Sequence, residues 1–318
     1  MPADSELGAF PVRHVAQVEE RPEEEAWLVE FLWGRRAVGF VAAPPKMCKT
    51  FLGCELAVAV ATGAPALGRF AVPRPGPVVF YGAEDDQPSL RARFEGIART
   101  RGVALANAPI FLLDVHQLRL DRPDDMARLR ATIAEHRPAL VVLDPFVRIA
   151  KIDENSAAEV SAVLGDLRAI QRELGTAILL AHHMRKSPSG HKGYQLRGSG
   201  DFAAWHDSAL FLSGSPDDLV LHVEHRGAAA PEPLRLRLVT GANPHLEITG
   251  APSPRVLTAE DPIQIAILER LAVASRPTST TELRDVLRAR KQTVTNALTA
   301  LERAGRVVRR DGGWVVAA

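Results

Sequence analysis

The segment 38–52, Val-Gly-Phe-Val-Ala-Ala-Pro-Pro-Lys-Met-Cys-Lys-Thr-Phe-Leu, restricts the fold of this chain more than any other. Its apolar beginning, residues 38–42, predicts a buried strand, and the Pro-Pro pair that follows prevents direct continuation into a helix. Helical spacing of apolar residues resumes at Thr50 and ends at Gly63, a residue typical of helix C-termini. The segment therefore predicts a strand, a tight loop and a helix in direct succession.

A Lys-Thr pair at the start of that helix completes the layout of a phosphate-binding loop (P-loop). In such a loop, backbone N–H groups hold phosphate oxygens, the lysine reaches the β- and γ-phosphates and the threonine hydroxyl binds Mg²⁺. The two glycines of the pattern G-x-x-x-x-G-K-[ST] fall on Ala43 and Cys48 here, so an ordinary strand–loop–helix corner with a surface lysine stays open. The predicted ATP-binding residues are Pro45, Lys46, Met47, Cys48, Lys49, Thr50 and Phe51.

Composition and charge are those of an ordinary globular protein. The 318 residues are 46% hydrophobic and 24% charged, enough for one large core and a small second domain. A net charge of +1 gives no overall basic signature of nucleic-acid binding. The two cysteines, Cys48 and Cys54, share one expected element, which indicates a reducing compartment without disulfides. Without a membrane-spanning apolar run or a secretion signal, we expect a cytoplasmic protein with no membrane partner.

Apolar strands alternate with helical stretches along most of the chain. Near-continuous apolar strands separated by helices predict an α/β fold with a mostly parallel central sheet covered on both faces. We expect an acidic lead-in over 1–25, this domain over 26–245, and a linker over 241–261. The expected strands are 38–42, 77–81, 110–113, 140–143 and 177–181, then 208–212, 219–224 and 234–239 as an antiparallel extension; the helices are 50–62, 87–100, 123–136 and 157–174.

Residues 256–318 predict a separate small module. Three helical stretches, 263–273, 280–288 and 292–304, precede two short strands around an Asp-Gly-Gly turn, the pattern of a winged helix-turn-helix domain. From residue 255 onward the chain carries eleven Lys and Arg against seven Asp and Glu. The candidate DNA-binding residues are Lys291, Gln292, Thr293, Thr295 and Asn296 on the third helix and Arg306, Arg309 and Arg310 on the wing. A protein-docking module with a solvated basic face is the alternative.

Polar residues follow several of the expected parallel strands, whose carboxyl ends form ligand sites in α/β proteins. Glu84 follows the second strand, and Asp144 ends the run 140–143 in the pattern of a Walker B acid that holds Mg²⁺. His182 and His183 follow the fifth strand. Adjacent histidines point in different directions and no third ligand is near, so a zinc site is disfavoured.

Together these motifs resemble those of RecA-like hexameric ATPases of the RepA type (plasmid replicative helicases), AAA-like P-loop NTPases related to the DnaB helicase core. The resemblance covers about residues 27–239. It rests on Pro45-Lys46-x-x-Lys49-Thr50, Glu84-Asp85, Asp144-Pro145, Asp153-Glu154-Asn155, His182-His183-x-Arg185-Lys186, Arg197-Gly198-Ser199 and His225-Arg226-Gly227.

The resemblance implies a Mg²⁺- and ATP-dependent homo-oligomeric ring, a hexamer, that acts on DNA. Thr50 and Asp144 would bind the metal, and Glu84 would orient the attacking water. His182 or His183 would sense the γ-phosphate, and Arg226 would enter the neighbouring subunit's site as an arginine finger. Arg185, Lys186, Lys192 and Arg197 would lie on loops that face DNA.

Three departures from the family pattern keep other functions open. Glu224 stands where the family commonly has lysine, and Ala43 and Cys48 replace glycines. A slowly hydrolysing nucleotide switch and a DNA-binding regulator that recruits partners through the winged helix are therefore the alternatives. Beside bound phosphate at a helix N-terminus, the Cys48 thiol is also expected to have a lowered pKa.

Overall fold

A computed structural model of the chain describes residues 10, 12–18, 25–184, 200–250, 262–272, 274, 276–287, 289, 291–303, 306–310 and 313–316. The chain divides into two compact units, residues 1–252 and 253–318. Arg185, Lys186, Lys192 and Arg197, expected on DNA-facing loops, lie outside the described residues.

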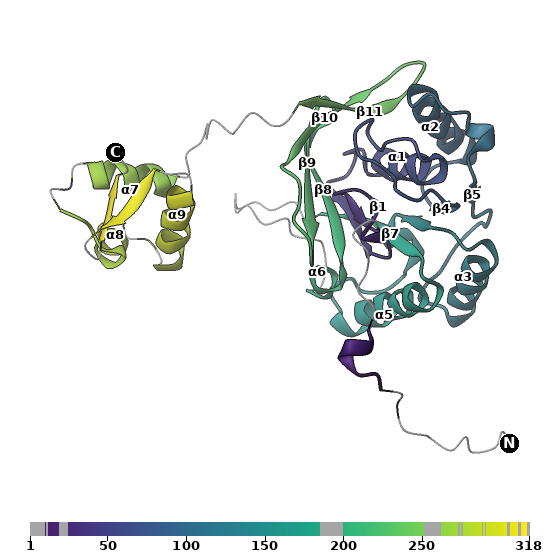
Figure 1. The fold of residues 1–318 in the computed structure, drawn as a ribbon, viewed down its shortest axis with the longest axis horizontal. Coiled ribbons are helices and arrows are strands. Elements are labelled where there is room, and N and C mark those ends of the chain that lie inside the picture. The colour runs from purple at the N-terminus through teal and green to yellow at the C-terminus, as the bar shows by residue number, and fades with distance from the viewer. Residues whose placement is uncertain are drawn as a thin grey trace. The chain divides into compact units, whose positions relative to one another are not determined.

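The first unit is built on one nine-stranded sheet (Figure 1). Six neighbouring strands, in the order β8-β3-β7-β6-β4-β5, are parallel, and β9, β10 and β11 continue the sheet in antiparallel pairing. The mostly parallel α/β sheet predicted from the sequence is confirmed. The strands are β3 (Val38–Ala43), β4 (Val78–Gly82), β5 (Ile110–Leu112), β6 (Leu140–Asp144), β7 (Ala177–His183), β8 (Ser208–Ser215), β9 (Asp218–His225), β10 (Leu234–Val239) and β11 (His245–Gly250).

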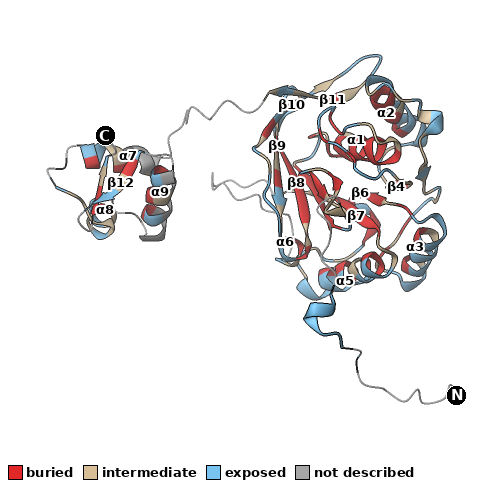
Figure 2. Cartoon of the chain, in the orientation of Figure 1, coloured by how far each residue is buried: buried red, intermediate tan, exposed pale blue. Residues whose placement is uncertain are grey.

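Helices cover both faces of the parallel strands (Figures 1 and 2). Alternate strand residues face opposite layers: Val41 packs with α1 and α2, whereas Phe40 packs with the helices of the other face. The predicted helices 87–100, 123–136 and 157–174 are confirmed residue for residue. One face carries α1 (Lys49–Thr62) and α2 (Gln87–Thr100), and the other α3 (Pro123–His136), α4 (Phe146–Ile149), α5 (Ala157–Leu174) and α6 (Asp201–Trp205).

The pairing of β3 with β8 depends on a glycine. A Cβ atom at Gly39 would lie 1.7 Å from the carbonyl oxygen of Ser208, so no other residue fits this close approach of two backbones. The predicted antiparallel extension is present, because β8 pairs antiparallel with β9 and β9 with β10; the prediction did not include the parallel pairing of β8 with β3 on its other side. This pairing places β3 between β7 and β8, in the interior of the sheet.

The last strand, β11, corrects the expectation of a linker over 241–261. Its burial is only partial, so its apolar signal in the sequence is weak. Besides its pairing with β10, β11 is held by a buried ion pair. Arg101 Nε lies 2.7 Å from Glu55 Oε1, and Arg101 Nη2 donates a hydrogen bond to the Leu246 carbonyl of β11 at 3.1 Å. Arg101 thereby joins helix α1 to β11, and the sheet continues to Gly250.

Small elements precede and connect the larger ones. An antiparallel hairpin of β1 (Trp27–Val29) and β2 (Trp33–Gly34), which the sequence analysis did not foresee, adds Leu28 and Trp33 to the core on the α1 side. The 3-10 turns are η1 (Val15–Gln17) and η3 (Leu105–Asn107). None of the helices in the described part of the chain has the length and apolar content needed to cross a membrane.

The second unit contains three helices and a hairpin, in the predicted order. Ser279 and Glu282 form a capping box at the start of its second helix: each side chain accepts a hydrogen bond from the other residue's backbone N–H, at 3.2 and 2.8 Å. Trp314 packs in the small core and its Nε1 donates to Thr280 Oγ1. The elements are α7 (Pro262–Ala272), α8 (Thr280–Leu287), α9 (Lys291–Arg303), β12 (Val307–Arg310) and β13 (Gly313–Val316). Their identity as a winged helix stays a prediction.

Candidate functional site

The loop between β3 and α1 contains two residues in the left-handed backbone region, Lys46 (φ +63°) and Cys48 (φ +56°). Cys48 occupies the N-cap position of α1, and its side chain makes no capping hydrogen bond. Ala43, in contrast, is the last residue of β3 and has no positive φ. Of the two positions where the P-loop pattern has glycine, only position 48 has a backbone conformation that favours glycine.

Lys49, the first residue of α1, lies buried beneath this loop. Its Nζ donates to the carbonyl oxygens of Ala43 (3.4 Å) and Pro44 (3.2 Å) and lies 3.3 Å from His183 Nδ1. Burial lowers the pKa of Lys49, and the negative charges of Asp144 and Glu84 act in the opposite direction. The amine is thus held among oxygen and nitrogen acceptors at the carboxyl edge of the sheet.

Asp144 ends β6 and receives a hydrogen bond from the Thr50 side chain. The strand β7 lies between β3 and β6, and α1 packs against both β7 and β6, which brings Thr50 to the acid. Burial raises the pKa of Asp144 to about 6, while the hydrogen bond from Thr50 and the charge of Lys49 oppose the shift. The predicted pair of Mg²⁺ ligands is therefore brought into direct contact.

The two adjacent histidines of β7 have different surroundings, because successive strand residues face opposite sides of the sheet. His182 is buried, stacks on Phe202 with ring centroids 4.3 Å apart and packs near Phe40 and Phe146. His183 faces the P-loop and contacts Lys49. Only His183 is thus in a position to sense a phosphate held by the loop.

Glu84 follows β4, whose Gly82 pairs with Asp144, so both carboxylates lie at the same edge of the sheet. Its Oε1 accepts a hydrogen bond from Arg148 Nε at 2.8 Å, and both side chains are solvent-exposed. Sequence reasoning missed Arg148, because the contact joins residues 64 positions apart and no local pattern indicates it. An exposed pair of this kind is weak and can open when a ligand competes for either partner.

Arg93 on α2 is a second residue that sequence reasoning missed. Its Nη2 donates to Asp85 Oδ1 at 2.7 Å, and its guanidinium lies 5.2 Å from the centre of the Phe51 ring. The sequence spacing of Phe51, Asp85 and Arg93 does not indicate that they are in contact. Arg93 also acts on the Cys48 thiol, but burial outweighs it and raises the pKa of Cys48. The expected lowering of the Cys48 pKa is therefore wrong.

Arg226 lies at the other edge of the sheet. It follows β9, whose last residue His225 pairs with Ser208, and Ser208 in turn pairs with Gly39 near the start of β3. Its backbone N–H donates to the Asp207 carbonyl, and its side chain is exposed. Within this chain, Arg226 therefore lies near the amino end of β3, and Lys49 lies beyond its carboxyl end.

The residues present fit a Mg²⁺ ion that is completed by phosphate. Among the described residues, no group of three or more His, Cys, Asp and Glu could hold a metal ion unaided. Mg²⁺ normally keeps several waters and takes one or two carboxylates together with phosphate oxygens. Thr50 and Asp144 supply the protein's share of such a set.

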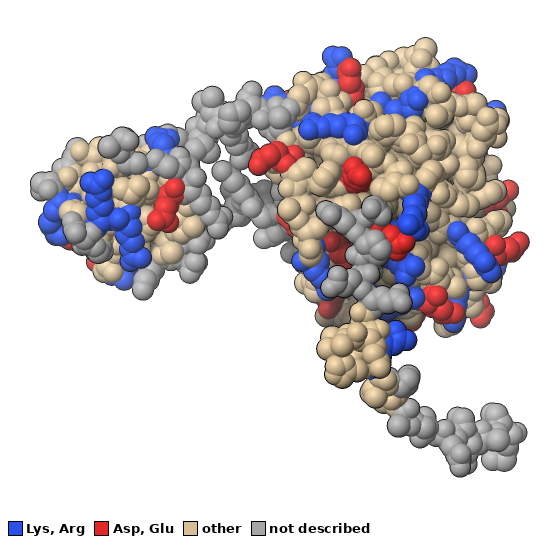
Figure 3. Space-filling model, in the orientation of Figure 1, with Lys and Arg blue, Asp and Glu red and all other residues tan. Residues whose placement is uncertain are grey.

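The second unit presents several basic side chains on the face shown in Figure 3. Thr295, Arg306, Arg309 and Arg310 are exposed, and the Arg309 guanidinium lies 5.7 Å from the centre of the Trp314 ring. The backbone of Lys291, Gln292, Thr293 and Asn296 begins α9 as predicted, but their side chains lie outside what the structure describes.

Comparison with known proteins identifies the family and the fold. The AAA_25 family, described as an AAA domain, matches residues 4–189. A structure of a DnaB-like replicative helicase aligns over 67% of this chain and 57% of its own, with 15% identity and a TM-score of 0.50. The RadB recombinase aligns over 66% of this chain and 90% of its own, with 19% identity and a TM-score of 0.49. No curated protein matches the chain. The helicase alignment supports a RecA-like P-loop fold and spans little more than half of that helicase.

The backbone of the loop predicts opposite effects of glycine at its two unusual positions. At position 48, glycine should give a higher free energy of unfolding than alanine by about 1 kcal/mol, because a left-handed conformation is costly for any residue with a Cβ. At position 43, the natural alanine should be more stable than glycine by about 0.5–1 kcal/mol. Urea unfolding of Cys48→Gly, Cys48→Ala and Ala43→Gly measures both differences, and the same sign at both positions would contradict this account.

Proposed function

Because the chain belongs to the AAA_25 family of AAA domains, we propose that it binds and hydrolyses ATP with Mg²⁺. The observation that carries the proposal is the contact of Lys49 with His183 beside the contact of Thr50 with Asp144, all at one edge of the sheet. A surface lysine on an ordinary corner needs none of these partners. Carboxylate, hydroxyl, amine and imidazole converge where a phosphate chain would lie.

Each residue has a role that its position supports. Lys49 would leave the carbonyls of its own loop and bind the β- and γ-phosphates, and Thr50 and Asp144 would hold Mg²⁺, which neutralises charge on the phosphates. Glu84 would orient the attacking water, and His183 would detect the γ-phosphate. The backbone from Pro45 to Phe51 would surround the remaining phosphate oxygens.

Assembly into a ring, as in RepA-type hexamers, is supported by the position of Arg226. This arginine lies at the edge of the sheet opposite its own P-loop and is exposed, so a phosphate that it reaches would belong to a neighbouring copy. A finger supplied by a neighbour stabilises transition-state charge. The proposed complex is a homo-oligomeric ring, a hexamer by the RepA resemblance.

DNA is the proposed substrate on which the ring acts, in replication or in the movement of a genetic element. The RepA-like motifs and the fold shared with a DnaB-like helicase support this part. The basic C-terminal unit, with exposed Arg306, Arg309 and Arg310 on and beside its hairpin, supports a winged helix that contacts DNA phosphates.

A slow nucleotide switch is the second candidate, and two observations favour it. Cys48 holds a left-handed conformation at the loop's second glycine position, and the Glu84 carboxylate is paired with Arg148. Both features would slow hydrolysis more than binding. In this alternative, ATP would assemble the ring and the C-terminal unit would recruit DNA or a protein partner.

ATP turnover by the purified protein, with and without single-stranded DNA, tests the proposal. Lys49→Ala and Glu84→Gln should abolish turnover, and Arg226→Ala should lower kcat by about 10³ or more while ATP still binds. A 1:1 mixture of Lys49→Ala and Arg226→Ala subunits should regain about one quarter of the wild-type sites, since each intact site then needs one partner of each kind.

Arg235→Ala is the matched control for Arg226→Ala, because Arg235 is also an exposed arginine near an aspartate, Asp218. It should leave turnover unchanged. Inactive mixtures of two separately folded variants would exclude a finger supplied by a neighbour. ATP binding without turnover in the wild type would select the switch, and no ATP binding at all would leave only a DNA-binding regulator.

The raised pKa of Asp144 predicts a pH dependence of Mg²⁺-dependent ATP binding. At pH 5, below the pKa of about 6, only about a tenth of Asp144 is ionised, so affinity for a nonhydrolysable ATP analogue with Mg²⁺ should be about tenfold weaker than at pH 7. Asp144→Asn reports the pH dependence of the nucleotide itself. Equal pH dependence in both proteins would show that Asp144 does not titrate in this range.

The basic hairpin predicts a salt-dependent share of DNA affinity. Arg309→Ala combined with Arg310→Ala should weaken duplex DNA binding and reduce the slope of log Kd against log salt by about 2. Arg270→Ala, which removes an exposed arginine of α7, is the control and should change neither quantity. An equal effect of the control would mean that total charge, rather than the hairpin, attracts DNA.

A further inference from the structure

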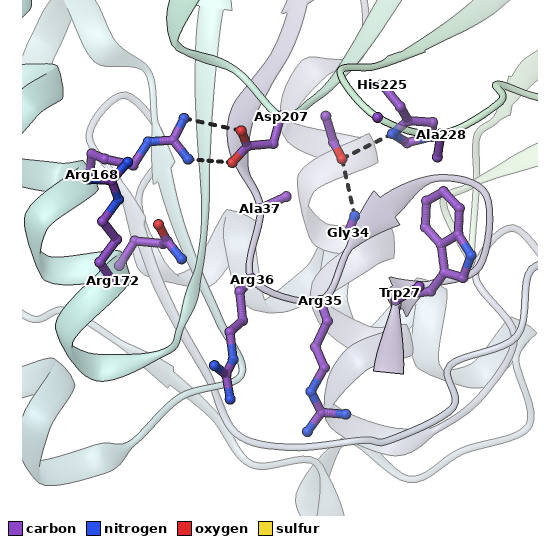
Figure 4. A pocket seen from close by; sticks show the side chains of 14 residues that line it. Trp27, Gly34, Arg35, Arg36, Ala37, Arg168, Arg172, Asp207, His225 and Ala228 are labelled. Atoms are coloured by element: carbon purple, nitrogen blue, oxygen red, sulfur yellow. Dashed lines mark hydrogen bonds and ion pairs between the residues drawn. The ribbon is translucent and has the colours of Figure 1, made fainter. Parts of the chain in front are cut away.

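A polar cleft opens at the amino edge of the parallel strands (Figure 4). Its volume is about 540 Å³, and its walls come from the β1–β2 hairpin, the start of β3, the last turns of α5, the start of β8 and the end of β9. It includes Ala37 and Ser208, whereas Lys49 and His183 lie at the opposite ends of β3 and β7. The cleft is therefore distinct from the P-loop site.

The lining of this cleft is strongly positive. Four arginines, Arg35, Arg36, Arg168 and Arg172, line it together with one carboxylate, Asp207. That carboxylate is already occupied, because Arg168 donates to both of its oxygens. Within the described part of the chain, the other three arginines have no ion pair with a carboxylate. Three uncompensated guanidinium groups around one cavity attract an anion.

The helix dipole explains part of this arrangement. Arg172 lies in the last turn of α5, and Arg36 lies close to Gly175, the C-cap of that helix, where cations are favourable. This accounts for two arginines on structural grounds alone. It does not account for Arg35, which extends beside Arg36 from the turn before β3 (Figure 4), or for the polar group that follows.

Gln171 is the second observation that points to a ligand. Its side chain lines the cleft although the residue is only 7% exposed. Among the described residues, its carboxamide has no hydrogen-bond partner. The carboxamide atoms are not fully enclosed, so they can be reached from the cleft and can hydrogen-bond to a ligand there.

The opposite wall of the cleft is aromatic. The Trp27 indole lines it and contacts His225 edge-on, with ring centroids 4.9 Å apart. Burial lowers the pKa of His225, and its ring nitrogens lie 3.1 Å from Ser208 Oγ and 3.0 Å from the Phe31 carbonyl. The indole and the guanidinium groups that line the same cleft offer a surface for a ring and donors for phosphate oxygens.

We propose that this cleft is a second ligand site, which binds a phosphorylated small molecule of nucleotide size. Arginine forks suit phosphate oxygens, Gln171 would pair with a polar group of the ligand, and Trp27 would pack against its ring. The volume of about 540 Å³ falls in the range of small-molecule sites. The site does not depend on ATP hydrolysis at the P-loop.

Calorimetric titration of the full-length protein with inorganic pyrophosphate and with ADP tests the site. The Lys49→Ala background removes the P-loop contribution, and this protein should still bind one equivalent of each probe. Adding Arg35→Gln and Arg172→Gln should weaken that binding about tenfold or more. Both substituted side chains reach solvent and lack ion pairs, so the fold should be kept, as thermal unfolding would verify.

Two controls make the result specific. Arg91→Gln, which removes an exposed arginine of α2 outside the cleft, should leave binding unchanged. ADP should also quench tryptophan fluorescence in the Lys49→Ala protein but not after Trp27→Phe is added. Absence of binding in the Lys49→Ala protein would overturn the proposal. Binding of a short oligothymidylate that needs Arg35 and Arg172, without binding of either small probe, would overturn it equally.

Discussion

The interior position of β3 is the constraint on which the rest of this structure depends. Its backbone forms hydrogen bonds with β7 on one side and with β8 on the other, and Gly39 permits the close approach of β8. Hydrogen bonds to neighbours on both sides fix the direction and register of β3. The position at which the P-loop leaves the strand is therefore fixed as well. Lys49 consequently meets His183 of the neighbouring strand, and α1 carries Thr50 over β7 to Asp144.

The two edges of the parallel strands have different electrostatics. The carboxyl edge combines Asp144 and Glu84 with Lys49, a mixture suited to a metal and phosphates together. The amino edge gathers arginines around a single carboxylate, Asp207, which Arg168 occupies and which also lies near Arg226. An anion bound in that cleft would therefore lie near the ion pair of Asp207 with Arg226, the residue proposed as the finger.

Much of the fold could be predicted because its signals are local. The caps and apolar spacing of α2, α3 and α5 lie within each helix, and their bounds are those predicted. The strand β11 and the parallel direction of β8 could not be predicted in the same way. Both depend on partners distant in sequence: Arg101 and Glu55 for β11, and the backbone of β3 for β8.

The sequence by itself determined most of the order of strands and helices. It indicated Lys49 and Thr50, since a phosphate loop is a contiguous motif, and Asp144, since an acid at the end of an apolar strand is the Walker B pattern. Only the tertiary structure decided that His183 rather than His182 meets the lysine, and that Arg148 pairs with Glu84. It also brought Arg35 and Arg172 to one cleft. Those choices depend on which side chains share a face after the sheet has formed, and residue spacing carries no record of that.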